Sequence, residues 1–169
     1  MKTTSSETVP CLNASAETST SNQPITGKRQ KRWPQRPLPP TAQEIDAILA
    51  EVAAEPDGQD VQDIVAILFQ TGMRRGEIGR LRWDNVNFED RCITILSGRS
   101  LQARYVPLGV EVAALLQARR DRKINSDHVV GPTPTITLYK VGRRFSDLSR
   151  RILGRRLTLH SLRHAFAAA

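Results

Sequence analysis

The chain has 169 residues, enough for one domain with a sizeable hydrophobic core. Its 25 Lys and Arg outnumber its 17 Asp and Glu, and the resulting net charge of +8 favours a polyanionic partner. Two cysteines exclude a disulfide framework and a cysteine-rich zinc module. No apolar run approaches the roughly 20 residues that span a bilayer, and no signal-peptide core follows the N-terminus. We therefore expect a cytoplasmic protein without a membrane segment.

The positive charge is concentrated at the two ends of the chain. Residues 1–40 carry six Lys/Arg and two acids, whereas residues 41–139 carry eleven Lys/Arg and fourteen acids. Residues 140–169 carry eight Lys/Arg and one acid. This distribution is typical of a solubilising tail plus a solvated helix face, and equally of a surface that binds a polyanion. Charge alone leaves both interpretations open.

The first 40 residues are not expected to belong to the folded domain. Residues 1–26 are rich in Ser, Thr, Asn and Glu and lack apolar periodicity, which predicts disorder. Residues 27–40 combine five basic residues with four prolines, which predicts an extended basic linker. The sequence therefore predicts a tail and linker over 1–40 and a folded domain over 41–169.

Three helices are predicted at the start of this domain, over residues 41–55, 60–72 and 74–83. Thr41 and Glu44 have the spacing of a capping box, which marks the start of the first helix. The second helix is apolar on nearly all sides, which indicates a central position in the core. Gly72 is its natural C-terminal cap.

The pattern then changes to short strands. Residues 91–96 and 103–108 are rich in branched and aromatic residues, and residues 97–102 between them predict a hairpin. A helix is predicted over 109–123, followed by a loop. Apolar residues at steps of three and four then predict an amphipathic helix: Leu138, Val141, Phe145, Leu148 and Ile152. Its outer face carries basic residues: Lys140, Arg143, Arg144, Arg150 and Arg151. Helices around one small antiparallel sheet make the expected fold class α+β.

Two segments carry residues suited to binding a phosphate. In "TGMRRGEIGRLRWDNV" (71–86), Arg74 begins a helix, where its guanidinium and the helix N–H groups can point at one anion. In "HSLRH" (160–164), helical spacing places His160, Arg163 and His164 on one face. A zinc site on the two histidines is the alternative. It lacks a third ligand, and Ser161 stands where the usual zinc motif has its glutamate.

A third segment, the hairpin "ITILSGRSLQARYVPLG" (93–109), contains Arg99 and Arg104, and basic residues at such a tip can touch a DNA backbone. In this order, the three segments resemble the catalytic domain of the tyrosine recombinases, also called the phage integrase family. The resemblance runs from about residue 41 to the last residue. It rests on the Thr-Gly-x-Arg-x-x-Glu block leading into Leu-x-Trp and on the His-x-Leu-Arg-His block.

The resemblance implies DNA integration or site-specific recombination. Members of this family cut one strand of double-stranded DNA with a tyrosine hydroxyl, form a 3′-phosphotyrosine link without metal or cofactor, and work as several subunits on the DNA. It implies that Arg74 and Arg163 hold the phosphate and that His160 is a hydrogen-bonding acid or base. Glu77 would orient Arg74 or support its helix, and His164 would be a structural histidine. We expect further DNA contacts from four arginines: Arg75, Arg104, Arg143 and Arg144.

Two departures from the family pattern bear on activity. The hairpin lysine that protonates the leaving oxygen in the family is replaced by Arg99, and an arginine gives up its proton much more reluctantly than a lysine. The only tyrosines, Tyr105 and Tyr139, precede the second signature, so neither matches the nucleophile and we expect both to be packing residues. We therefore expect a catalytic domain that is incomplete at its C-terminus and cannot cleave DNA.

Three hypotheses follow from the sequence. The chain is part of an active integrase, a DNA-binding remnant that competes with a full-length recombinase, or the product of a decayed gene that does not fold. The target site, the oligomeric state and the host element, whether phage, plasmid, integron or chromosome, are left open by the sequence.

Overall fold

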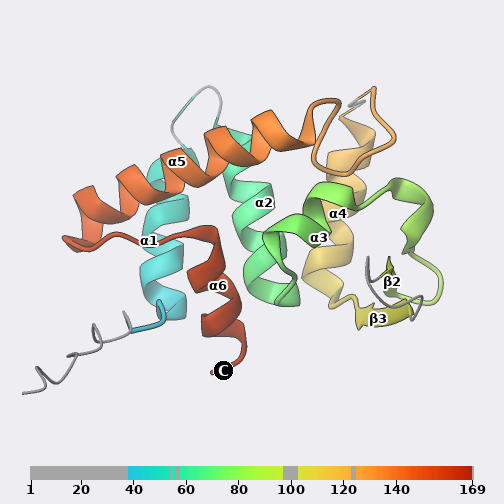
Figure 1. Ribbon diagram of the computed structural model, residues 1–169, viewed down its shortest axis with the longest axis horizontal. Coiled ribbons are helices and arrows are strands. Elements are labelled where there is room, and N and C mark those ends of the chain that lie inside the picture. Colours follow the sequence, from blue (N-terminus) through green and yellow to red (C-terminus); the bar gives the residue numbers. More distant parts are fainter. Residues whose placement is uncertain (1–37, 54, 56–57, 97–102, 123–124, 169) are drawn as a thin grey trace, which may run out of the picture. The chain divides into compact units, whose positions relative to one another are not determined.

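The computed structural model describes residues 38–168 except 54, 56–57, 97–102 and 123–124 (Figure 1). The predicted tail, most of the predicted linker and the hairpin tip with Arg99 lie outside the described residues. The helices are α1 (Ala42–Ala53), α2 (Gly58–Thr71), α3 (Arg75–Arg80), α4 (Val110–Asp121), α5 (Pro134–Leu153) and α6 (Leu159–Phe166). The strands are β1 (Val86–Asn87), β2 (Cys92–Leu96) and β3 (Ala103–Pro107), and a 3-10 turn, η1 (Trp83–Asn85), precedes them. The predicted α+β class is confirmed.

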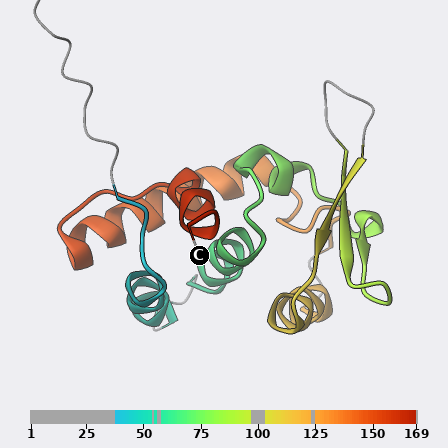
Figure 2. The same cartoon turned by 90° about the horizontal axis from the view of Figure 1, so that it is seen from below.

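Helix α2 is the central element, as its apolar composition predicts. It packs against α1, α4, α5 and α6, and both views place α6 beside it (Figures 1 and 2). Its side chains Ile64, Val65, Ile67 and Leu68 are fully buried. Burying four such side chains contributes about 1.5–3 kcal/mol each relative to exposure. The position of α2 fixes where its C-terminal end meets α3 and α6.

The sheet is antiparallel with strand order β1-β2-β3. The β2–β3 register pairs Ile93 with Val106 and Ile95 with Arg104. Ile93, Ile95 and Val106 are buried, so this face of the sheet is the one that joins the core. The two-residue strand β1 was not predicted, because a run that short has no detectable period of two.

Helix α5 buries the predicted apolar stripe over most of its length. Leu138, Val141, Phe145 and Leu148 are buried, but Ile152 is 36% exposed, so the prediction that it continues the stripe is wrong. Ile152 lies in the last turn of the helix, next to Gly154, which ends it in the left-handed conformation.

Ion pairs join α1 and Glu55, two residues after its end, to α5 and to the segment after α5. Arg144 donates to both carboxylate oxygens of Glu55, and Arg151 lies 2.7 Å from Glu51. Arg155 lies 2.6 Å from Glu44, whose carboxylate also accepts from the backbone N–H of Thr41 in the predicted capping box. Part of the positive charge of residues 140–169 is therefore balanced by two glutamates of α1, Glu44 and Glu51, and by Glu55 after its end.

A buried arginine fastens α4 to α2 and to the loop before α5. Arg119 is fully buried and donates to the carboxylates of Asp60 (2.9 Å) and Asp63 (2.6 Å). It also donates to the backbone carbonyls of Val129 and Val130 at 2.7 and 2.8 Å. This arrangement could not be predicted from the sequence, because the carbonyl partners have no side-chain signature and the aspartates lie 56 and 59 residues away.

Within the described residues, no helix is both long and apolar enough to cross a bilayer.

Candidate phosphate-binding site

The first candidate segment is a tight turn between α2 and α3. Thr71 ends α2, and its hydroxyl donates to the carbonyl of Ile67 at 2.5 Å. Gly72 follows with a φ of +60°, the left-handed conformation that glycine adopts without strain. Met73 is buried, and Arg74 precedes the first residue of α3 in extended conformation. The turn therefore anchors the chain on both sides while leaving the Arg74 side chain 62% exposed.

Glu77 holds Arg74 at two points. Its Oε2 accepts the backbone N–H of Arg74 at 2.7 Å, and its Oε1 accepts from the Arg74 guanidinium at 3.0 Å. The first bond satisfies one of the unpaired donors at the start of α3. The second fixes one edge of the guanidinium, so a phosphate would meet an arginine whose direction is already set.

Glu77 also receives an arginine from the sheet. The Arg104 guanidinium on β3 donates to Glu77 Oε2 at 2.6 Å, and the Glu77 side chain is only 9% exposed. Burial alone would raise the pKa of the Glu77 carboxyl. The bonds from the Arg74 backbone, Arg104 and the Arg74 side chain outweigh it, and the pKa lies below its usual value. Glu77 is therefore held as a carboxylate between two arginines.

The second candidate segment is α6, which lies beside the turn after α2. Thr158 and Ser161 cap its start, and Leu159 and Leu162 bury its inner face. These contacts aim Arg163 at the turn, where its guanidinium donates to the backbone carbonyl of Gly72. This bond joins two residues that are 91 positions apart in the sequence. The two signature blocks therefore meet at Gly72.

The two histidines of α6 are both exposed and contact each other. Their ring centroids lie 4.6 Å apart in an edge-to-face arrangement. One turn of helix separates them, as the spacing of four residues predicts. Among the described residues, no three His, Cys, Asp or Glu side chains converge into a possible metal site. His160 and Arg163, three residues apart, lie on one face of α6.

The other predicted DNA contacts fall into two kinds. Arg75 is exposed at the start of α3, and Arg143 is exposed on α5 with only a 3.9 Å approach to Asp147. Arg104 and Arg144 instead have glutamate partners, Glu77 and Glu55. DNA contact by any of the four stays a prediction. To contact DNA, Arg104 and Arg144 would have to bind a phosphate while they remain paired with a glutamate.

The expectation that both tyrosines are packing residues is wrong. Tyr105 is 70% exposed and Tyr139 is 61% exposed. Tyr105 lies on the outer face of the sheet, because the alternation along β3 points Arg104 and Val106 to the other face. Tyr139 follows buried Leu138 on α5 but lies outside the buried stripe of that helix.

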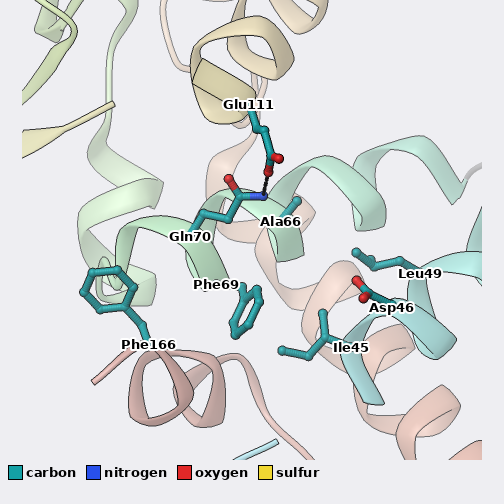
Figure 3. A pocket seen from close by; sticks show the side chains of 8 residues that line it. All are labelled: Ile45, Asp46, Leu49, Ala66, Phe69, Gln70, Glu111 and Phe166. Atoms are coloured by element: carbon teal, nitrogen blue, oxygen red, sulfur yellow. Dashed lines mark hydrogen bonds between the residues drawn. The ribbon is translucent and has the colours of Figure 1, made fainter. Parts of the chain in front are cut away.

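A groove of about 470 Å³ lies between α1 and α2, with contributions from α4 and α6 (Figure 3). Its walls are apolar, formed by Ile45, Leu49, Ala66, Phe69 and Phe166. Its polar side chains include Asp46 and Glu111, and Gln70 donates to Glu111 at 3.2 Å. The two carboxylates would repel a phosphate, so this groove is not the anion site.

The contact between Glu77 and Arg104 is the feature of the site that the sequence analysis missed. A signal was present: Arg104 lies two residues before Val106, so the period of two places a charge on the inner face of the strand. A charge in that position needs a partner. The partner could not be identified, because it is 27 residues away on a different element.

Residues 41–169 match the phage integrase family. Tyrosine recombinase XerD of Chlamydia pneumoniae is 32% identical over 152 residues, which cover 81% of this chain and 50% of the relative. Tyrosine recombinase XerC of Xanthomonas axonopodis pv. citri is 29% identical, covering 86% and 49%. The chain spans about half the length of the curated relatives it matches.

Solved structures share the fold. The crystal structure of XerA recombinase superposes with a TM-score of 0.63 at 23% identity, covering 79% of this chain and 50% of that one. The Tn1549 transposon integrase, solved in complex with transposon right-end DNA, gives a TM-score of 0.64 at 19% identity, covering 76% and 51%.

Proposed function

Because the chain belongs to the phage integrase family, we propose that it acts in DNA integration or site-specific recombination as the phosphate-binding part of a DNA breaking-and-rejoining centre. Arg74 and Arg163 bind the non-bridging oxygens of the scissile phosphate, and His160 is the hydrogen-bonding acid or base beside them. The observation that carries this proposal is the bond from Arg163 to the carbonyl of Gly72, two residues before Arg74.

The chemistry of the three side chains suits this role. Phosphoryl transfer concentrates negative charge on the non-bridging oxygens, and fixed positive donors stabilise that charge most when they need no rearrangement. Arg74 is preset by Glu77, and Arg163 by the Gly72 carbonyl. Each guanidinium has further N–H groups beyond those used in these bonds, because arginine carries five.

The covalent step needs a tyrosine hydroxyl, which attacks phosphorus as the 5′-oxygen leaves. Neither Tyr105 nor Tyr139 follows the second signature, and we assign the nucleophile to neither of them. The proposal therefore gives these residues phosphate binding and activation only, with the nucleophile supplied from outside the 169 residues. We place the activity on double-stranded DNA in the cytoplasm of a bacterial host, with other recombinase subunits as partners.

Two exposed arginines extend the proposed DNA surface beyond the phosphate pair. Arg75 is adjacent to Arg74, and Arg143 lies on the solvent side of α5. For Arg144 we propose a structural role, because both of its bonds to Glu55 tie α5 to the segment that follows α1. We keep Arg99 as a proposed contact with a DNA phosphate. Its positive charge can bind the phosphate, but an arginine donates a proton poorly.

The test is duplex DNA binding by the intact chain, measured by fluorescence anisotropy across a salt series. Arg74→Met and Arg163→Met should each weaken binding and lower the slope of log K against log salt by about one. Arg151→Met is the matched control, since it removes an exposed arginine that pairs with Glu51 on α1. Equal binding by the control and both site variants would contradict the proposed site.

A second measurement separates recombination from DNA binding without cleavage. A protein that continues through the family's tyrosine should form a covalent adduct with a nicked duplex, and Arg74→Met should abolish it. DNA binding with no adduct in that longer protein would favour a non-catalytic DNA-binding protein.

A further inference from the structure

We propose that Arg104 is a positioning residue, which acts through Glu77 to fix the direction of the Arg74 guanidinium and thereby connects the β2–β3 hairpin to the phosphate site. This inference rests on the proposed function for its consequence on DNA binding. Its structural basis is independent of that function.

The first observation is the sharing of one carboxylate. Glu77 Oε2 accepts both the Arg74 backbone N–H at 2.7 Å and the Arg104 guanidinium at 2.6 Å. Glu77 Oε1 then accepts from the Arg74 guanidinium at 3.0 Å. Because Arg104 and the backbone hold Oε2, the carboxylate cannot rotate freely, and Oε1 stays directed at Arg74.

The second observation is the partial burial of Arg104, whose side chain is 42% exposed. Its Nε is buried and has no hydrogen-bond partner among the described residues. A buried donor without a partner destabilises the folded state, and the charged bond to Glu77 offsets this loss. The strand register pairs Arg104 with Ile95 and so places it on the inner face of the sheet. The bond to Glu77 compensates for the buried part of its guanidinium group.

The third observation is where Arg104 lies in the hairpin. It is the second residue of β3, the strand that begins directly after the segment 97–102. Displacement of this strand end would move the Arg104 guanidinium and release Glu77 Oε2. The site would then lose the fixed direction of Arg74, even though no residue that contacts phosphate had changed.

The first arm of the test uses NMR on the free protein. The titratable or charged groups that face Glu77 are Arg74 on α3 and Arg104 on β3, with Arg80 and Arg82 lining the same small hollow. In Arg104→Met, the pKa of Glu77 should rise towards the ordinary glutamate value. The Arg74 Nε–H signal should shift to that of a freely rotating guanidinium.

Arg104→Lys restores one positive charge and should bring the pKa of Glu77 back down. Arg151→Met, which removes another arginine from a glutamate, should leave both signals at their wild-type positions. Folding is checked by a thermal melt, and Arg104→Gln gives the same test if the Met variant does not fold. Unchanged Glu77 and Arg74 signals in a folded, uncharged variant would overturn the proposal.

The second arm uses duplex DNA binding and a double-mutant cycle. Arg104→Met should weaken binding by about fivefold, in the range of coupling between contacting residues. In a background of Arg74→Met it should cause no further loss, because Arg104 acts only through Arg74. An additive loss would show that Arg104 contacts DNA directly and would overturn the positioning role.

The two arms distinguish this inference from the proposed function. If the Glu77 and Arg74 signals change in Arg104→Met but Arg74→Met leaves DNA binding unchanged, the positioning role is supported and the proposed phosphate site is contradicted. If Arg74→Met weakens DNA binding but the signals do not change in Arg104→Met, the phosphate site is supported and the positioning role is contradicted.

Discussion

The aromatic ring of Phe166 packs directly over the α-carbon of Gly72, so that a β-carbon at position 72 would overlap the ring. Gly72 lies in the turn before Arg74, and Phe166 is the last residue of the helix that carries Arg163. This contact and the bond from Arg163 to the Gly72 carbonyl are two independent links between the same segments. The approach of α6 to the turn therefore depends on glycine at position 72.

Replacement of Gly72 by alanine should destabilise the protein for two separate reasons. The φ of +60° costs an L-residue about 1–2 kcal/mol, and the new methyl group overlaps Phe166. Gly154→Ala is the matched control, because Gly154 has a φ of +67° but nothing within 4 Å of a β-carbon. Urea unfolding should show a larger loss for Gly72→Ala than for Gly154→Ala. Equal losses would mean that the ring moves aside without cost.

Replacement of Arg119 by methionine should be among the most damaging single changes in the chain. It removes the donor of the carbonyls of Val129 and Val130, and it leaves the buried Asp63 carboxylate with Arg122 and Gln59 but without its buried arginine partner. Breaking one side of a buried ion pair typically costs about 3–5 kcal/mol. Arg120→Met, which removes the exposed neighbouring arginine, should change the free energy of unfolding by about 0.5 kcal/mol or less. A similar small loss for Arg119→Met would contradict the structural role.

The capping glutamate of α1 should make stability depend on pH in the acid range. The pKa of Glu44 is lowered, first by the hydrogen bond from the Thr41 backbone and, against the opposing effect of burial, by Arg155. A carboxyl with a depressed folded pKa contributes stability above its unfolded pKa and loses that contribution as the pH falls through the folded value. Glu44→Gln should therefore cost about 0.5–1 kcal/mol at pH 7.

The difference between wild type and Glu44→Gln should shrink as the pH falls below the ordinary glutamate pKa of about 4.3. Urea unfolding of both proteins at several pH values measures it. A difference that stays constant down to the acid limit would show that the charge of Glu44 is not what stabilises the helix start.

Neighbouring arginines on α5 should differ in what they do. Arg143→Gln should lower the salt slope of duplex binding by about one, as loss of one phosphate contact does. Arg144→Gln should instead leave the slope unchanged and lower stability, because Arg144 pairs with Glu55. Anisotropy and urea unfolding on both variants give the comparison. A lower salt slope of duplex binding in Arg144→Gln would show that Arg144 contacts DNA.

Much of the fold could be predicted from local signals. The capping box at Thr41, the glycine end of α2 at Gly72 and the apolar period of α5 each depend on residues within one or two turns of each other. The same holds for the phosphate candidates, since the placement of Arg74 at a helix start and of His160 beside Arg163 follows from short spacings. Their order along the chain then indicated the family.

The partners of charged residues could not be predicted in this way. Arg104 and Arg144 were both expected on a DNA surface, but one contacts Glu77 and the other Glu55. The exposure of Tyr105 and Tyr139 was missed for a related reason, because aromatic character does not say which face of an element a neighbour covers.

Most elements, their apolar faces and the family follow from local sequence, because periodicity, caps and signature spacing act over a few residues. Tertiary packing sets which arginines are held by carboxylates, which are exposed, and that Arg163 reaches the turn before Arg74. The two groups of features differ in the range of the interactions behind them. These pairs join residues 27 to 91 positions apart, and their geometry exists only once α2, α5, α6 and the sheet have packed together.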